Sequence, residues 1–211
     1  MQHTTVSSAP TTRSGSSPRS TRWRVVDIVV ASVVGVALGV VFWAWAIPYG
    51  AAETPLKAVL PGVQAFMGAV WLIGAVLGGL LIRKPGAALY VELLAALVSA
   101  LLGSQWGLGT LISGLVQGLG AEIVFALFLY RVWRLPVAWL AGAGAGVGLA
   151  VNDLLTWYAG SSALFATVYA VSAVVGGALV AGTLSWLAVR ALARAGALSR
   201  FVAGRDSGEL V

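Results

Sequence analysis

The sequence contains no cysteine, and its single histidine, His3, lies in the N-terminal tail. Without cysteine the chain has no disulfides, no thiol nucleophile and no thiolate ligand for an iron–sulfur cluster. One histidine outside the apolar part of the chain leaves no basis for a structural zinc site or a histidine proton relay. We therefore predict no metal and no cofactor, and expect the chemistry to depend on carboxylates, amides and aromatic rings.

Charge is also scarce. Only 9% of the residues are charged and 59% are hydrophobic, whereas a soluble domain carries roughly a quarter charged residues. Six apolar runs approach or exceed the length of about 18 residues that suggests a transmembrane helix. The sequence thus predicts an all-α integral membrane protein with a bundle of six transmembrane helices, at 25–47, 63–82, 86–103, 110–130, 137–157 and 164–189.

The basic residues are distributed unevenly among the loops. Of 13 lysines and arginines, twelve precede the first run or follow an even-numbered run, and only Lys57 follows an odd-numbered one. By the positive-inside rule, both termini are predicted to be cytoplasmic, and loops 48–62, 104–109 and 158–163 to lie outside. The net charge of +6 therefore reflects topology, and no nucleic-acid partner is expected.

The ends of the chain differ in composition from the apolar middle. Residues 1–22 are rich in Ser, Thr, Pro and Arg and are predicted to form a disordered cytoplasmic tail. A six-helix domain is expected over 23–192, followed by a cytoplasmic C-terminal tail over 193–211. A cleaved signal peptide is disfavoured, because the apolar stretch 25–43 exceeds the hydrophobic region of roughly 7–15 residues that such peptides carry.

Small residues recur at four-residue spacing in several runs, including Gly74 and Gly78 in the second and Gly114 and Gly118 in the fourth. Such spacing lets helix backbones approach closely in lipid. For most of these glycines we expect packing within the bundle. The stripe Ala31, Gly35 and Gly39 in the first run is suited equally to packing inside the bundle and to contact with a different subunit.

Three carboxylates, Glu92, Glu122 and Asp153, fall inside apolar runs, where they are costly and commonly functional. Asp27 lies one turn from Arg24 and is interpreted as a structural ion pair. Amides and indoles accompany the three acids, and together they predict an outward-facing cavity for a small aromatic amine or cationic heterocycle. The predicted binding residues are Gln105, Trp106, Gln117, Glu122, Asn152, Asp153 and Trp157.

Other interpretations of these residues stay open. Trp106 and Trp157 lie near membrane boundaries, where tryptophan commonly forms the interfacial aromatic belt. Glu92 and Glu122 are also suited to hydrogen bonding between neighbouring helices. No G-x-x-x-x-G-K-[ST] phosphate loop is present, so the chain is not expected to hydrolyse ATP itself.

The segment RKPGAALYVELLAALVSALLGSQWGLGTLISGLVQGLGAEIVFALF, residues 83–128, strongly resembles the YkoE family. The resemblance extends over about 22–190. Members of this family are substrate-binding S components of energy-coupling factor (ECF) transporters. The resemblance implies a multi-pass protein of a prokaryotic plasma membrane that is not an enzyme. It also implies a transmembrane coupling subunit and cytoplasmic ATPases as partners, with Ala31, Gly35 and Gly39 matching a docking stripe.

The resemblance further implies a thiamine-related substrate, either hydroxymethylpyrimidine or thiamine. An aminopyrimidine offers hydrogen bonds to Glu122 and the amides and a flat face to Trp106 or Trp157. Asp153 is placed to offset the positive charge of thiamine, and the proline-containing loop 48–62 to act as a lid. The alternatives are a non-transporting helper subunit or an oligomeric pore, and a membrane-embedded enzyme ranks last.

Overall fold

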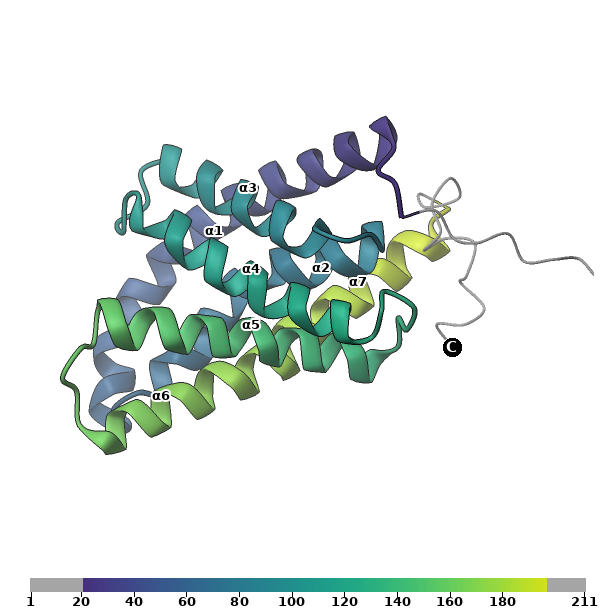
Figure 1. Cartoon of the computed structure of the whole chain (residues 1–211). Helices are drawn as coiled ribbons and strands as arrows, with labels where there is room; N and C mark the ends of the chain where they lie inside the picture. Colours follow the sequence, from purple (N-terminus) through teal and green to yellow (C-terminus); the bar gives the residue numbers. More distant parts are fainter. Residues whose placement is uncertain (1–20, 197–211) are drawn as a thin grey trace, which may run out of the picture.

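The structure, a computed structural model, describes residues 21–196 and is entirely helical within them (Figure 1). The predicted tails, 1–22 and 193–211, fall almost wholly outside this range. The elements are α1 (Val25–Val59), η1 (Val63–Leu72), α2 (Ile73–Ile82), α3 (Ala87–Leu101), α4 (Gly109–Leu127), α5 (Leu135–Thr156), α6 (Ala163–Gly176), η2 (Gly177–Gly182) and α7 (Thr183–Arg194).

The six predicted spans are confirmed as helical segments. Five helical stretches are long and apolar enough to cross a membrane, and α3 is a shorter apolar helix. α2 lies at the centre, with every residue from Gly74 to Ile82 buried. Large apolar side chains such as Val33 and Ile123 remain more than half exposed on the outer helices, as expected for surfaces that face lipid.

The first span differs from its prediction. α1 continues without a break through Pro48 and Pro55 to Val59, a helix of 35 residues. At about 1.5 Å per residue it is about 52 Å long, against a hydrocarbon thickness of about 30 Å. The segment predicted as loop 48–62 is therefore helical as far as Val59, and α1 is longer than the hydrocarbon core is thick. Proline removes a helical hydrogen bond, and the Glu53–Lys57 pair, one turn apart, adds local support to the helix between Pro48 and Val59.

The second span is divided between two kinds of helix. η1 is a 3₁₀ helix of ten residues, longer than the three or four residues usual for this conformation. Indole groups join it to α1 in both directions: Trp45 Nε1 donates to the carbonyl oxygen of Met67, and Trp71 Nε1 donates to that of Phe42. These bonds hold η1 against α1 in the half of the bundle opposite the chain termini.

Glycines set the packing of the last three spans, as predicted. A Cβ atom on Gly142 would lie 2.0 Å from the carbonyl oxygen of Gly177 in the π-helical segment η2, and one on Gly144 would lie 2.5 Å from that of Gly120 in α4. Both contacts require glycine. α5 is thus packed backbone to backbone between α4 and the sixth span.

The stripe on α1 corrects the prediction that Ala31, Gly35 and Gly39 face another subunit. All three are buried within the chain. A Cβ atom on Gly35 would lie 3.0 Å from the Leu94 side chain, and one on Gly39 would lie 2.5 Å from Val98 Cβ. The stripe packs against α3, because the missing side chains let the α1 backbone come close to Leu94 and Val98.

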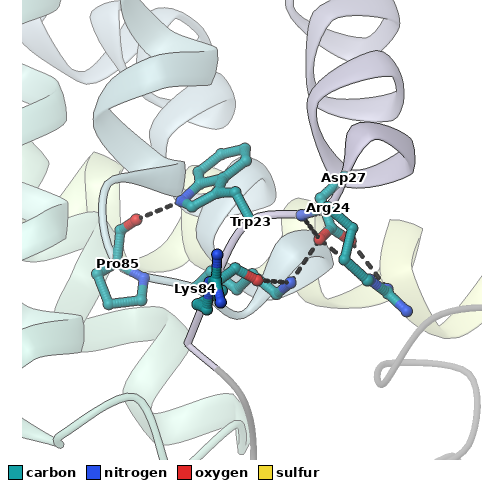
Figure 2. Close-up of polar contacts among 6 residues, drawn as sticks. Trp23, Arg24, Asp27, Lys84 and Pro85 are labelled. Atoms are coloured by element: carbon teal, nitrogen blue, oxygen red, sulfur yellow. Dashed lines mark hydrogen bonds and ion pairs between the residues drawn. The ribbon is translucent and has the colours of Figure 1, made fainter.

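Near the N-terminal end of the described chain, Asp27 joins α1 to the α2–α3 turn (Figure 2). Its carboxylate accepts hydrogen bonds from the Arg24 backbone and guanidinium and from Lys84 Nζ. Trp23 Nε1 donates to the Pro85 carbonyl oxygen at 2.9 Å. The predicted structural ion pair of Asp27 is confirmed, and the buried Lys84 ammonium extends it.

The α1–α3 contact predicts different outcomes for substitutions at a buried and at an exposed small residue of α1. Gly39→Leu should lower the free energy of unfolding by about 1–3 kcal/mol or more, because a new side chain meets Val98 and the Ala95 carbonyl oxygen. Ala37→Leu is the matched control, since Ala37 is exposed and should leave stability unchanged. Thermal unfolding of the detergent-purified variants, followed by tryptophan fluorescence, measures both. Equal melting temperatures would contradict the packing of the stripe.

Candidate functional site

A cavity of about 450 Å³ opens at the end of the bundle opposite the described chain termini. In Figure 1 this is the left end, where α1 ends and where the α3–α4 turn and the α5–α6 loop lie. Its walls come from α1, η1, α3, α4, α5 and α6. The volume is within the range of roughly 300–1,000 Å³ of pockets that bind small organic ligands.

The cavity has a deep end and a shallow end. Glu92 lies nine residues before the last residue of α3, or about 13 Å from the end of that helix at about 1.5 Å per residue. Asp153 lies three residues before the end of α5, about 4–5 Å from it by the same rise. Gln117, eight residues into α4, is at a depth similar to that of Glu92.

Glu92 forms the acidic floor. Its side chain is 1% exposed, and Oε2 accepts a hydrogen bond of 2.7 Å from the Ala75 backbone amide in the first turn of α2. A Cβ atom on Gly74 would lie 2.5 Å from this oxygen, so only glycine leaves room for the carboxylate. The described residues place no basic side chain in a salt bridge with Glu92.

An aromatic wall stands above the floor. The rings of Tyr49 and Trp71 have centroids 4.8 Å apart, and those of Trp71 and Trp106 are 5.0 Å apart, both edge to face. Trp106 is brought in by the α3–α4 turn, where Gly103 and Gly107 have φ angles of 90° and 53°. Such left-handed backbone favours glycine, and it folds the turn so that Ser104, Gln105 and Trp106 line the cavity.

The shallow end contains a second acid, Asp153. Its Oδ2 accepts from the Tyr169 hydroxyl and its Oδ1 accepts from Asn152 Nδ2 at 2.8 Å. Asn152 Nδ2 also donates to Ser113 Oγ at 2.8 Å, which links α5 to α4. The carboxylate is therefore held in a fixed position by neutral donors, and no described basic residue neutralises it.

The mouth is bordered by Glu53 and Lys57 of α1 and Tyr158 of the α5–α6 loop. Lys57 Nζ lies 2.7 Å from Glu53 Oε1, and the Tyr158 hydroxyl donates to the same oxygen at 3.1 Å. Burial raises the pKa of Tyr158, which keeps its hydroxyl protonated and able to donate. These contacts connect residues 105 positions apart across the opening.

The structure brings together most of the predicted site residues. Five of them line the cavity: Gln105, Trp106, Gln117, Asp153 and Trp157. Asn152 lies directly behind the wall, bonded to Asp153 and Ser113. Only Glu122 is elsewhere.

Glu122 lies toward the opposite end of α4 and does not line the cavity. Its carboxylate accepts from the backbone amides of Gly86 at 2.6 Å and Ala88 at 3.0 Å, and from the Tyr130 hydroxyl at 2.7 Å. The amides at the start of α3 have no partner within the helix, and a carboxylate satisfies them and complements the helix dipole. This is the helix-bonding alternative raised by the sequence.

The sequence pattern left most of the lining residues out of the predicted site, and three of them share one cause. Tyr49, Glu53 and Lys57 fall in the segment that was expected to be a loop. The four-residue spacing of Glu53 and Lys57 was the available signal for a helix there. Glu92 was recognised as an intramembrane acid, but its spacing alone did not place it in the cavity.

Taken together, the cavity is a small-solute site with three carboxylates and a single ammonium group among its lining side chains. Neutral amides, hydroxyls and indoles complete it. This arrangement suits a ligand that donates hydrogen bonds or carries positive charge. In a multi-pass membrane chain without a phosphate loop, it defines the class as a solute-binding membrane subunit of a transporter.

Comparisons with known proteins agree with that class. A family model described as the permease component of an ABC-type cobalt transport system matches residues 26–148. A Bacillus subtilis (strain 168) protein named "Putative HMP/thiamine permease protein YkoE" is 36% identical over 191 residues, covering 87% of this chain and 92% of that protein. A solved crystal structure of an S component of an ECF transporter superimposes with a TM-score of 0.82 at 34% identity, covering 89% of this chain and 94% of the other.

The chain therefore belongs to the S components of energy-coupling factor transporters, within the ABC-transporter permease family that matches it. It is a multi-pass plasma-membrane protein of the prokaryotic type and not an enzyme. As an S component it binds a small-molecule substrate and works with a transmembrane coupling subunit and ATPase subunits.

The position of Glu122 leads to a prediction that separates stability from binding. Glu122→Gln should lower the free energy of unfolding by about 2 kcal/mol, because a carboxamide cannot accept all the hydrogen bonds that the carboxylate accepts. Ligand affinity of the folded fraction should stay within about twofold, since binding at the cavity is unaffected. Thermal unfolding and calorimetric titration of the same sample test this. A large loss of affinity at unchanged stability would contradict this and indicate that Glu122 contacts the ligand.

Proposed function

We propose that this S component captures hydroxymethylpyrimidine or thiamine in the described cavity, with Glu92, Gln117, Trp106 and Asp153 as its principal contacts. The observation that carries the proposal is the buried Glu92 carboxylate beneath a wall of indole rings. Both ligands contain an aminopyrimidine ring, which has an exocyclic amine and a flat aromatic face. The name of the B. subtilis relative supports the same ligands.

The amine is assigned to the deep end. Glu92 uses Oε2 for the Ala75 amide, and a carboxylate has further lone pairs to accept a ligand N–H bond. Gln117, also buried at the cavity surface, offers both a donor and an acceptor to the ring nitrogens. Trp71 and Trp106 provide aromatic surface against which the ring packs.

The chemistry of the lining favours an organic ligand over the cobalt named in the family description. Imidazole and thiolate groups are the usual protein ligands of such transition metals. The cavity is lined by neither, and no group of three potential metal-ligating residues occurs among residues 21–196. Three carboxylates separated by aromatic side chains fit an amine better than they fit a metal ion.

The proposal also fixes an orientation. Eight of the described basic residues lie at the end opposite the cavity, and only Lys57 lies beside its mouth. The positive-inside rule therefore places the cavity on the outer side and both termini in the cytoplasm, where the ATPases that drive transport are found.

Single-cysteine labelling tests this orientation without background, because the chain has no cysteine. Ser161→Cys in the α5–α6 loop should react with a membrane-impermeant maleimide on intact cells. Ala195→Cys, after α7, should react only after lysis. The reverse pattern would contradict an outward-facing cavity.

Calorimetric titration of the detergent-purified chain with hydroxymethylpyrimidine and with thiamine tests the binding itself. One-to-one binding of either ligand is expected. Glu92→Gln should weaken both by about tenfold or more, because a charge-assisted hydrogen bond contributes about 1.5–3 kcal/mol. A folded wild-type chain that binds neither ligand would refute the proposed substrate, and full affinity in Glu92→Gln would remove Glu92 from the contact set.

A further inference from the structure

The mouth of the cavity already contains a positively charged group, supplied by the protein. Lys57 Nζ is 2.7 Å from Glu53 Oε1 and 5.3 Å from the centroid of the Tyr158 ring. A carboxylate on one side and an aromatic face within about 6 Å on the other form a recognised environment for a cation. The Lys57 ammonium occupies the position that this environment would offer to a charged ligand.

The surroundings extend the same environment toward the interior. The rings of Tyr158 and Tyr169 are 5.1 Å apart, and the Tyr169 hydroxyl donates to Asp153. Glu53 and Asp153 thus bracket a pair of tyrosine rings, with one ammonium group for two carboxylates. All of these side chains line the cavity.

We propose that Lys57 is an internal competitor for the cationic part of the ligand, and that it thereby sets the preference between a charged two-ring ligand and a neutral one-ring ligand. This inference rests on the proposed function. A ligand with a quaternary ring nitrogen must displace Lys57 from Glu53 and Tyr158 to use this environment, or accept repulsion from it. A neutral ring bound at Glu92 does neither.

The same geometry argues against a role for Lys57 as an anchor for a negatively charged ligand group. Its partner Glu53 also accepts a hydrogen bond from Tyr158, and Asp153 lies on the same side of the cavity. A phosphate ester would therefore meet two carboxylates for one ammonium that is already paired. Lys57 is positioned to compete with cations at the mouth, and the mouth as a whole disfavours anions.

The test is calorimetric titration of Lys57→Gln and wild type with thiamine, which is permanently charged, and with hydroxymethylpyrimidine, which is neutral at pH 7.5. Without the Lys57 ammonium, Glu53 and the Tyr158 ring are free to contact the charged ring of thiamine. Thiamine binding should therefore tighten by about fivefold, the scale expected for a partly exposed ion pair. The affinity for hydroxymethylpyrimidine should not change, and its titration reports the fraction of competent sites in each preparation. Lys57→Arg, which retains the charge, is the matched control and should behave like wild type.

A second variant assigns the effect to Glu53. In the double variant Glu53→Gln, Lys57→Gln, the gain in thiamine affinity should disappear, because the Glu53 carboxylate that would bind the ligand's positive charge is absent. Unchanged or weaker thiamine binding by Lys57→Gln, with hydroxymethylpyrimidine binding intact, would overturn the inference and leave the proposed function standing. A wild-type chain that binds neither ligand would overturn both.

Discussion

Close backbone contact between helices is the constraint on which this structure depends. In lipid no hydrophobic force drives one apolar helix onto another, so van der Waals contact must hold them. The glycines of α5 meet this requirement on two sides: Gly142 contacts Gly177, and Gly144 contacts Gly120. The α1 stripe does the same against α3. These contacts are possible only where side chains are missing, and they fix the helices that carry the site.

The cavity forms where this close packing stops. Along α1 the small residues Gly35 and Gly39 are succeeded by Phe42 and Tyr49, which are buried and line the cavity. At the same level η1 adopts a 3₁₀ conformation and contributes Gly68 and Trp71. Large aromatic side chains keep the helices apart, and the polar side chains between them remain accessible to a ligand.

The carboxylates of the chain divide into two kinds by the groups that surround them. Asp27 and Glu122 accept several hydrogen bonds each, from basic side chains or from helix amides, and connect α1 and α4 to the start of α3. Glu92 and Asp153 have fewer partners and no salt bridge to a basic side chain among residues 21–196, and their cavity surface is available to a ligand. The same side-chain chemistry therefore holds one end of the bundle together and recognises a solute at the other. Lys57 and Glu53 combine the two roles, because they form an ion pair with each other and also line the mouth of the cavity.

The sequence by itself determined the class of the protein. Hydropathy gave six spans because a membrane requires runs of apolar residues, and the scarcity of charge made each intramembrane acid conspicuous. Five of the seven predicted site residues line the cavity. Gln105, Trp106, Asp153 and Trp157 lie at or near helix ends that converge there, and Gln117 reaches it from the middle of α4. Tertiary structure alone decided the rest. Glu122 and Glu92 occur at similar depths in the sequence pattern, yet only Glu92 faces the cavity, because helix rotation is set by contacts between helices. The α1 stripe looked equally suited to an internal or an external partner, and the contacts of Gly35 and Gly39 with α3 decided for the internal one. The continuation of α1 through two prolines brings Glu53 and Lys57 over the mouth, and their four-residue spacing was the weak local signal for it.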